Sequence, residues 1–154
     1  MMSEAALAGR LDGGVHILPV RVYYEDTDFS GAVYHANYLK FCERGRSDCL
    51  RHLDIHHSAL HVGEDRTAFV VRRMVCDFLK PARIDDLLSV ETRFVELGGA
   101  RMELDQRVSR GGDMLFQAAV TVVLVDAAGR PKRLPVTMRD SLLRLQRDRP
   151  RPGT

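Results

Sequence analysis

One long helical segment, set among strand-like runs, constrains the fold of this chain most. From about residue 36 to residue 53, apolar side chains recur at helical spacing, while charged residues occupy mainly the other sides. The strand-like runs cover residues 16–24, 69–79, 88–97, 101–109 and 115–126. A helix and a sheet each have an apolar side to bury, so one sheet must cover this helix. We predict an α+β fold, a single domain in which an antiparallel five-stranded sheet wraps around one long central helix.

The strand-like runs differ in how they expose their faces. In 101–109, Met102, Leu104 and Val108 alternate with charged residues, which predicts one buried and one wet face. The run 115–126 is the most apolar, which predicts an interior strand. Glycine-rich turns at 98–99 and 111–113 predict tight hairpins, so we expect the four runs after the helix to form a meander. Residues 140–146 are expected to form a short closing helix or a segment that contacts a partner.

Length and composition indicate one ordinary globular domain. The 154 residues suit a single domain, for which we expect bounds of 15–147, with flexible ends at 1–14 and 148–154. The 23 basic residues nearly balance the 21 acidic ones. This balance argues against binding nucleic acid or an anionic membrane by bulk charge attraction.

The cysteines and the N-terminus favour a cytoplasmic protein. Three cysteines form no CxxC pair, and an odd number cannot be fully paired within one chain. A reducing compartment is therefore the simpler expectation. The first residues have neither the basic region nor the long apolar region of a signal peptide. No apolar run approaches the roughly 20 residues that span a bilayer.

The segment between the first strand and the helix carries the chemistry. It holds the acids Glu25, Asp26 and Asp28, is closed by Gly31, and leads to Asn37, which is a candidate cap of the helix. A helix start offers unpaired N–H groups and the positive end of the helix dipole. A carboxylate beside such donors suits acyl transfer, because the donors stabilise an oxyanion. Taken alone, the same pattern is also typical of a solvated loop or a capping system.

A longer string of residues is more specific. It runs Tyr24-Glu25-Asp26-Thr27-Asp28, then Gly31, then Val33-Tyr34-His35-Ala36-Asn37-Tyr38-Leu39, and a second run is Asp77-Phe78-Leu79-Lys80-Pro81-Ala82-Arg83. These residues closely resemble the 4-hydroxybenzoyl-CoA thioesterase family of hot-dog proteins, and most of all the branch associated with the bacterial Tol–Pal system. The resemblance covers about residues 17–135. It implies a hot-dog fold and the hydrolysis of acyl-CoA thioesters.

The resemblance also implies roles for individual residues. Asp28 falls on the catalytic aspartate, which acts either as a nucleophile through an anhydride or as a general base for water. His35 falls on the position whose backbone N–H polarises the thioester carbonyl, and a role for its side chain stays open. The substrate-binding positions are Tyr24, Gly31, Val33, Tyr34 and Asn37. Glu25 and Asp26 are assigned to the structure of the loop.

Partners and cofactors follow from the same resemblance. The substrate is an acyl-CoA, or alternatively an acyl-carrier-protein thioester, and no cofactor is expected beyond the coenzyme A of the substrate. A homodimer or homotetramer is expected, with the sites at the subunit boundary, since edge strands and one apolar sheet face would otherwise stay exposed. Basic residues should meet the CoA phosphates. The candidates are Lys80, Arg83, Arg101, Lys132 and Arg133.

Two rival functions remain. His52, His56, His57 and His61 cluster in the sequence, and the first two have the i, i+4 spacing that can ligate zinc on a helix. The HExxH pattern is absent, so a solvated loop without a metal is the favoured interpretation. The other rival is a module that binds acyl-CoA or acyl carrier protein, or assembles with partners, with little turnover.

Overall fold

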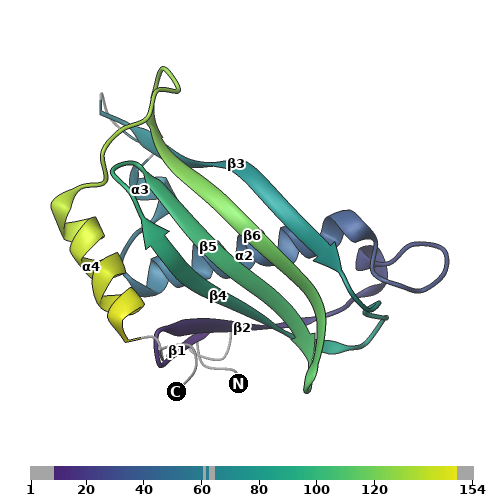
Figure 1. Ribbon diagram of the computed structural model, residues 1–154. Helices are drawn as coiled ribbons and strands as arrows, with labels where there is room; N and C mark the ends of the chain where they lie inside the picture. Colours follow the sequence, from purple (N-terminus) through teal and green to yellow (C-terminus); the bar gives the residue numbers. More distant parts are fainter. Residues whose placement is uncertain (1–8, 61, 63–64, 149–154) are drawn as a thin grey trace, which may run out of the picture.

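The fold is a single sheet curved around a long helix. The computed structural model describes residues 9–60, 62 and 65–148, with the side chains of residues 57 and 58 excepted. Its strands are β1 (Arg10–Asp12), β2 (Val15–Arg21), β3 (Thr67–Phe78), β4 (Leu87–Leu97), β5 (Arg101–Arg110) and β6 (Asp113–Asp126). Its helices are η1 (Tyr24–Asp26), α2 (His35–His52), α3 (His57–Leu60) and α4 (Val136–Arg147). Figure 1 shows α2 lying across one face of the sheet, which confirms the expected arrangement of layers.

The order of the strands corrects the predicted topology. Within the described residues the sheet has six strands, in the order β1-β2-β4-β5-β6-β3, and neighbouring strands pair antiparallel. The sixth strand is β1, which pairs with β2 although the sequence analysis assigned its residues to the N-terminal tail. Its three residues are all exposed, so no alternation marks it as a strand.

The expected four-strand meander is also wrong, because only β4, β5 and β6 follow one another in space. β3 pairs with β6 at the far edge, and β2 takes the place beside β4. The segment from residue 79 to residue 86 therefore crosses between strands that are not neighbours. The most apolar strand, β6, is flanked on both sides, which confirms its predicted interior position.

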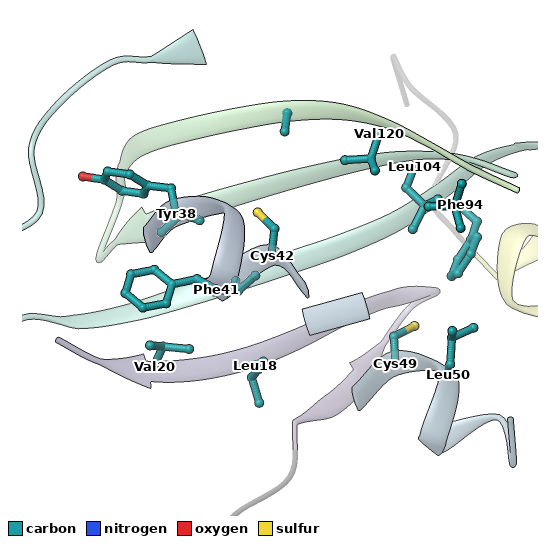
Figure 2. Packing of buried hydrophobic residues seen from close by; sticks show 14 of the residues in the cluster. Leu18, Val20, Tyr38, Phe41, Cys42, Cys49, Leu50, Phe94, Leu104 and Val120 are labelled. Atoms are coloured by element: carbon teal, nitrogen blue, oxygen red, sulfur yellow. The ribbon is translucent and has the colours of Figure 1, made fainter. Parts of the chain in front are cut away.

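The core lies where one face of α2 meets the sheet. Figure 2 shows Tyr38 and Cys42 of the helix among strand residues of this core, and both are buried. Helix and sheet approach closely at Gly45, where an added Cβ would lie 2.9 Å from Val90 Cγ1. Gln106 lies beneath the same turn and donates from Nε2 to the carbonyl of Cys42 at 2.9 Å. A glycine thus lets helix and sheet touch while a buried amide remains hydrogen-bonded.

The opposite face of β4 and β5 is charged. Glu91 is level with Arg107, and Arg93 is level with Asp105, so opposite charges face each other across the two strands. This pattern confirms the wet face predicted for the third run. On β4 and β5 this outer face is therefore charged rather than apolar.

The C-terminal helix α4 confirms the closing helix and extends the predicted 140–146 at both ends. Its buried residues Met138, Leu142 and Leu145 recur at helical spacing. It contacts β4, and Gln146 Nε2 donates to the carbonyl of Val95 at 2.6 Å. Among the described residues, no helix has the length and apolar character needed to cross a membrane.

The contact at Gly45 predicts that Gly45→Val destabilises the fold by roughly 1–3 kcal/mol, because the new side chain meets Val90 in a filled core. Urea unfolding followed by circular dichroism measures this difference. Lys40→Val is the matched control, since Lys40 is exposed on the same helix and reports the helix propensity of valine alone. Equal unfolding midpoints for the two variants would contradict the proposed steric role of the glycine.

Candidate active site

A buried carboxylate fixes the loop between β2 and α2. Asp26 is only 4% exposed, and its Oδ2 accepts the Tyr23 N–H at 2.9 Å. Its Oδ1 accepts Nδ2 of Asn37 at 3.0 Å, and its carbonyl accepts the Tyr34 N–H at 2.9 Å. One residue therefore ties the end of the strand to the start of the helix. The predicted structural role of Asp26 agrees with these bonds.

Asn37 has a different place from the one that its sequence position suggested. The residue before the first turn of α2 is Tyr34, with no side-chain cap, and Asn37 lies inside the helix. The Asn37 amide is buried against Asp26. It therefore does not cap the helix, and as a substrate-binding candidate it acts through the loop rather than from a cleft.

Asp28 lies at the exposed tip of the loop. Its Oδ1 accepts the Ser30 hydroxyl at 2.5 Å and the Ser30 N–H at 2.9 Å. These bonds, the hydroxyl first, lower the pKa of Asp28 below its ordinary value, so the group is ionised at neutral pH. Gly31 turns the chain with φ +82°, a conformation that glycine adopts without strain. The Asp28 side chain is exposed, and the nearby Ala32 backbone also favours its ionised form.

The start of α2 supplies hydrogen-bond donors beside this loop. Figure 1 shows that the loop extends from one end of α2. His35 is the first residue of α2 at that end. As at any helix start, the first N–H groups have no partner within the helix. Among the described residues, no backbone carbonyl accepts a hydrogen bond from the His35 N–H. The imidazole of His35 is exposed and contacts two rings, with centroids 4.5 Å from Tyr34 and 6.2 Å from Phe78.

A cleft of about 260 Å³ opens at this end of the helix. Its lining residues are Val33, His35, Tyr38, Phe78, Leu79, Lys80 and Pro81. Of the predicted site residues, Val33 and His35 line it, whereas Asp28, Tyr24 and Tyr34 lie outside its lining. Tyr24 is 83% exposed on the outer part of the loop. The structure thus brings the helix start and the apolar cleft together, and Asp28 lies outside the lining of that cleft.

Phe78 and Leu79 form the wall that the sequence analysis did not assign to the site. Each is 51% exposed, which is unusual for two large apolar neighbours at the end of a strand. The only signal in the sequence was their place in the second matching run.

The basic residues proposed for the CoA phosphates are not all near this cleft. Lys80 lines it, and Arg83 is next to the loop through its bridge to Ala32. Arg101 is level with Val123, whereas Phe78 is level with Phe116, a separation of about 23 Å along β6. Lys132, whose N–H bonds to Leu124, is also at that far end, with Arg133 next to it in the chain. Within one subunit, Arg101, Lys132 and Arg133 therefore lie far from this cleft, and their contact with the phosphates stays a prediction.

Comparison with known proteins identifies the family of this chain. The family model described as the thioesterase superfamily matches residues 30–117. The acyl-CoA thioester hydrolase YbgC of Escherichia coli O6:H1 is 44% identical over 119 residues, 76% of this chain and 87% of the relative. The acyl-CoA thioesterase YbgC of Haemophilus influenzae is 47% identical over 116 residues, 75% of this chain and 84% of the relative.

A solved structure extends the likeness to three dimensions. The crystal structure of a probable thioesterase from Bartonella henselae is 46% identical, with a TM-score of 0.76, and the match covers 79% of this chain and 99% of that one. These relatives confirm the expected hot-dog fold and the expected enzyme class, a thioester hydrolase. The chain belongs to the thioesterase superfamily.

Proposed function

We propose that this protein hydrolyses acyl-CoA thioesters with Asp28 as the reacting carboxylate and the His35 N–H as the donor to the thioester carbonyl. One observation carries the proposal: an ionised and exposed carboxylate lies on a loop that is hydrogen-bonded to a helix start. Relatives that are 44–47% identical bear the name of acyl-CoA thioester hydrolase or thioesterase, which supports the same reaction here.

Two routes are consistent with this arrangement. As a general base, the Asp28 carboxylate takes a proton from water, the resulting hydroxide attacks the carbonyl carbon, and the C–S bond breaks. As a nucleophile, the carboxylate attacks the same carbon, expels the CoA thiolate and leaves an anhydride that water then hydrolyses. In both routes the thiolate gains a proton, and the products are a free acid and CoA. The oxyanion of the tetrahedral intermediate would accept a hydrogen bond from the His35 N–H, and the helix dipole would stabilise its charge.

The substrate would lie along the cleft at the helix start. Val33, Tyr38 and Phe78 offer apolar surface to the acyl group, with Val33 and Tyr38 buried beneath. Within one subunit, Lys80 and Arg83 are the remaining basic candidates for the phosphates of CoA. An acyl-carrier-protein thioester stays an alternative donor, since it presents the same thioester on a similar arm.

A second copy of the chain is proposed to cover β3. This strand forms one edge of the sheet and exposes four large apolar side chains, Val70, Val71, Val75 and Phe78. An open apolar edge strand invites pairing with another strand, and a symmetric dimer satisfies it. Because Phe78 also lines the cleft, the partner would lie beside the site, as expected for a homodimer or a tetramer built from dimers.

A cytoplasmic location is proposed on the state of the thiols. Cys42, Cys49 and Cys76 form no disulfide, which suits a reducing compartment. Burial raises the pKa of Cys42 and Cys49 to about 12, so neither thiol competes with Asp28 as a nucleophile. Membership in the Tol–Pal-associated branch stays a prediction from the sequence motif.

The role of Asp28 predicts that Asp28→Asn lowers kcat for acyl-CoA hydrolysis by about 10²- to 10⁴-fold, because the amide neither attacks nor takes a proton. Release of free thiol from a panel of acyl-CoAs measures the rate. Glu25→Gln is the matched control, since it removes an exposed acid from the same loop and should keep the rate. Full activity in Asp28→Asn would rule out the mechanism, and binding without turnover by the wild type would favour the binding module.

The hydrogen bond from Ser30 predicts a shift in pH dependence. The Ser30 hydroxyl stabilises the ionised form of Asp28, so Ser30→Ala should raise the pKa of Asp28. Since either route needs the ionised carboxylate, the acidic limb of the kcat/KM profile should move to higher pH. Thr27→Val is the control, because that hydroxyl donates to the carbonyl of Tyr24 instead. An unmoved acidic limb in Ser30→Ala would contradict the assignment of that limb to Asp28.

The proposed dimer predicts that Val75→Lys lowers the molecular mass in solution and reduces hydrolysis with it, because a charge enters the covered edge. Multi-angle light scattering with a parallel activity assay measures both. Leu11→Lys places the same charge on β1, the opposite edge strand, and should change neither. A fully active monomer would contradict a site at the subunit boundary.

A further inference from the structure

Three potential metal ligands meet at the end of α2 that is farthest from the proposed site. His16 of β2 places Nε2 2.7 Å from Oδ2 of Asp48, and Nε2 of His52 lies 3.5 Å from the same oxygen. The three ligand atoms lie within 4.8 Å of one another. Asp48 and His52 are one helical turn apart, so both side chains lie on the same side of α2.

The spacing and the donor types fit one ion. Ligands about 2.0–2.2 Å from a tetrahedral zinc ion lie about 3.4 Å from each other, close to the separation of Asp48 and His52. The shorter separation of His16 and Asp48 is that of a hydrogen bond, whose proton an ion would replace. Two imidazoles and one carboxylate are a set that Zn²⁺ and its neighbours in the first transition row accept.

The surroundings hold these ligands in position. The Gly9 N–H donates to Oδ2 of Asp48 at 2.7 Å, and Nη1 of Arg51 lies 3.5 Å from Oδ1. Hydrogen bonds of this outer kind orient ligating carboxylates in metal sites. A Cβ on Gly9 would lie 2.7 Å from Nε2 of His16, so only glycine lets the backbone close this side.

The cluster is buried at His16 and open at His52. His16 is fully buried. Its Nδ1 has no hydrogen-bond partner in the described chain, and the bond to Asp48 places the ring proton on Nε2. The site has an entrance, since the His52 side chain is 31% exposed and Asp48 lines an open hollow of about 810 Å³ between α2 and β2.

We propose that His16, Asp48 and His52 bind one divalent transition-metal ion of the Zn²⁺ class, with the remaining coordination open to water. The ion would fasten β2 and the backbone at Gly9 to the last turns of α2. These turns begin about 20 Å along the helix from His35, so the ion stabilises the fold and takes no part in hydrolysis.

This site differs from the histidine cluster that the sequence suggested. The His56 side chain is 45% exposed, and its only described charged neighbour is Asp54 at 3.9 Å. The side chain of His57 and all of His61 lie outside the described residues. His52 lies in the same cluster as His16, which is 36 positions earlier in the chain. The spacing of histidines along the helix does not reveal this pairing.

Titration of the metal-free full chain, purified without a histidine tag, with Co²⁺ tests the proposal. The visible absorption of bound Co²⁺ should reach one equivalent, and added Zn²⁺ should displace it. His52→Gln should weaken binding at least about tenfold, because it removes a ligand. His56→Gln is the matched control and should bind like the wild type. Both histidines are partly exposed, so neither change is expected to prevent folding.

Thermal unfolding provides a second readout. Zn²⁺ should raise the Tm of the wild type and of His56→Gln, and a chelator should reverse the rise, since an ion that binds only the folded state stabilises it. His52→Gln should show a much smaller rise. The proposal would be overturned if the wild type bound no metal, or if His52→Gln bound it with the same affinity as the wild type. It would also be overturned if His56→Gln bound it more weakly, or if the spectrum showed a thiolate-to-cobalt band from a cysteine.

Discussion

The buried carboxylate of Asp26 is the interaction on which the proposed site depends. It joins the end of β2, the loop and the first turn of α2 through Tyr23, Tyr34 and Asn37. A buried acid left without these donors would bear a desolvation cost of roughly 1–3 kcal/mol or more, so the loop has one stable path. Asp28, two residues later, is exposed and bonded only within the loop. Burial thus separates two neighbouring acids into a structural group, Asp26, and an exposed one, Asp28, for which we propose the chemistry.

Local side-chain periodicity allowed much of the fold to be predicted. The helix expected from about residue 36 to residue 53 is His35–His52, and five of the strands appear where alternation placed them. The periodicity of a segment does not reveal which distant segment it pairs with. The place of β3 beside β6, and the addition of β1, depend on backbone bonds across the sheet, so the predicted meander and strand number were wrong.

The site was predictable only where residues lie close together in the sequence. The motif indicated Asp28 and His35, whose roles stay a proposal, and the structure shows the loop before His35 hydrogen-bonded to the start of the helix. Asn37 was misplaced because a side chain that caps a helix and one that bonds to a loop look alike in sequence. The wall formed by Phe78, and the pairing of His16 with Asp48, require the sheet to bring distant residues together.

The exposure of Asp28 links the proposed chemistry to the proposed dimer. A general base works best when its pKa lies near the working pH, whereas the bonds from Ser30 lower the pKa of Asp28. In an open loop, water also solvates the carboxylate and weakens every interaction with the developing oxyanion. A partner subunit close to the loop would exclude part of this water, and desolvation would raise the pKa of Asp28. Assembly would then create the reactive carboxylate as well as the binding surface, because both effects come from removing the same water.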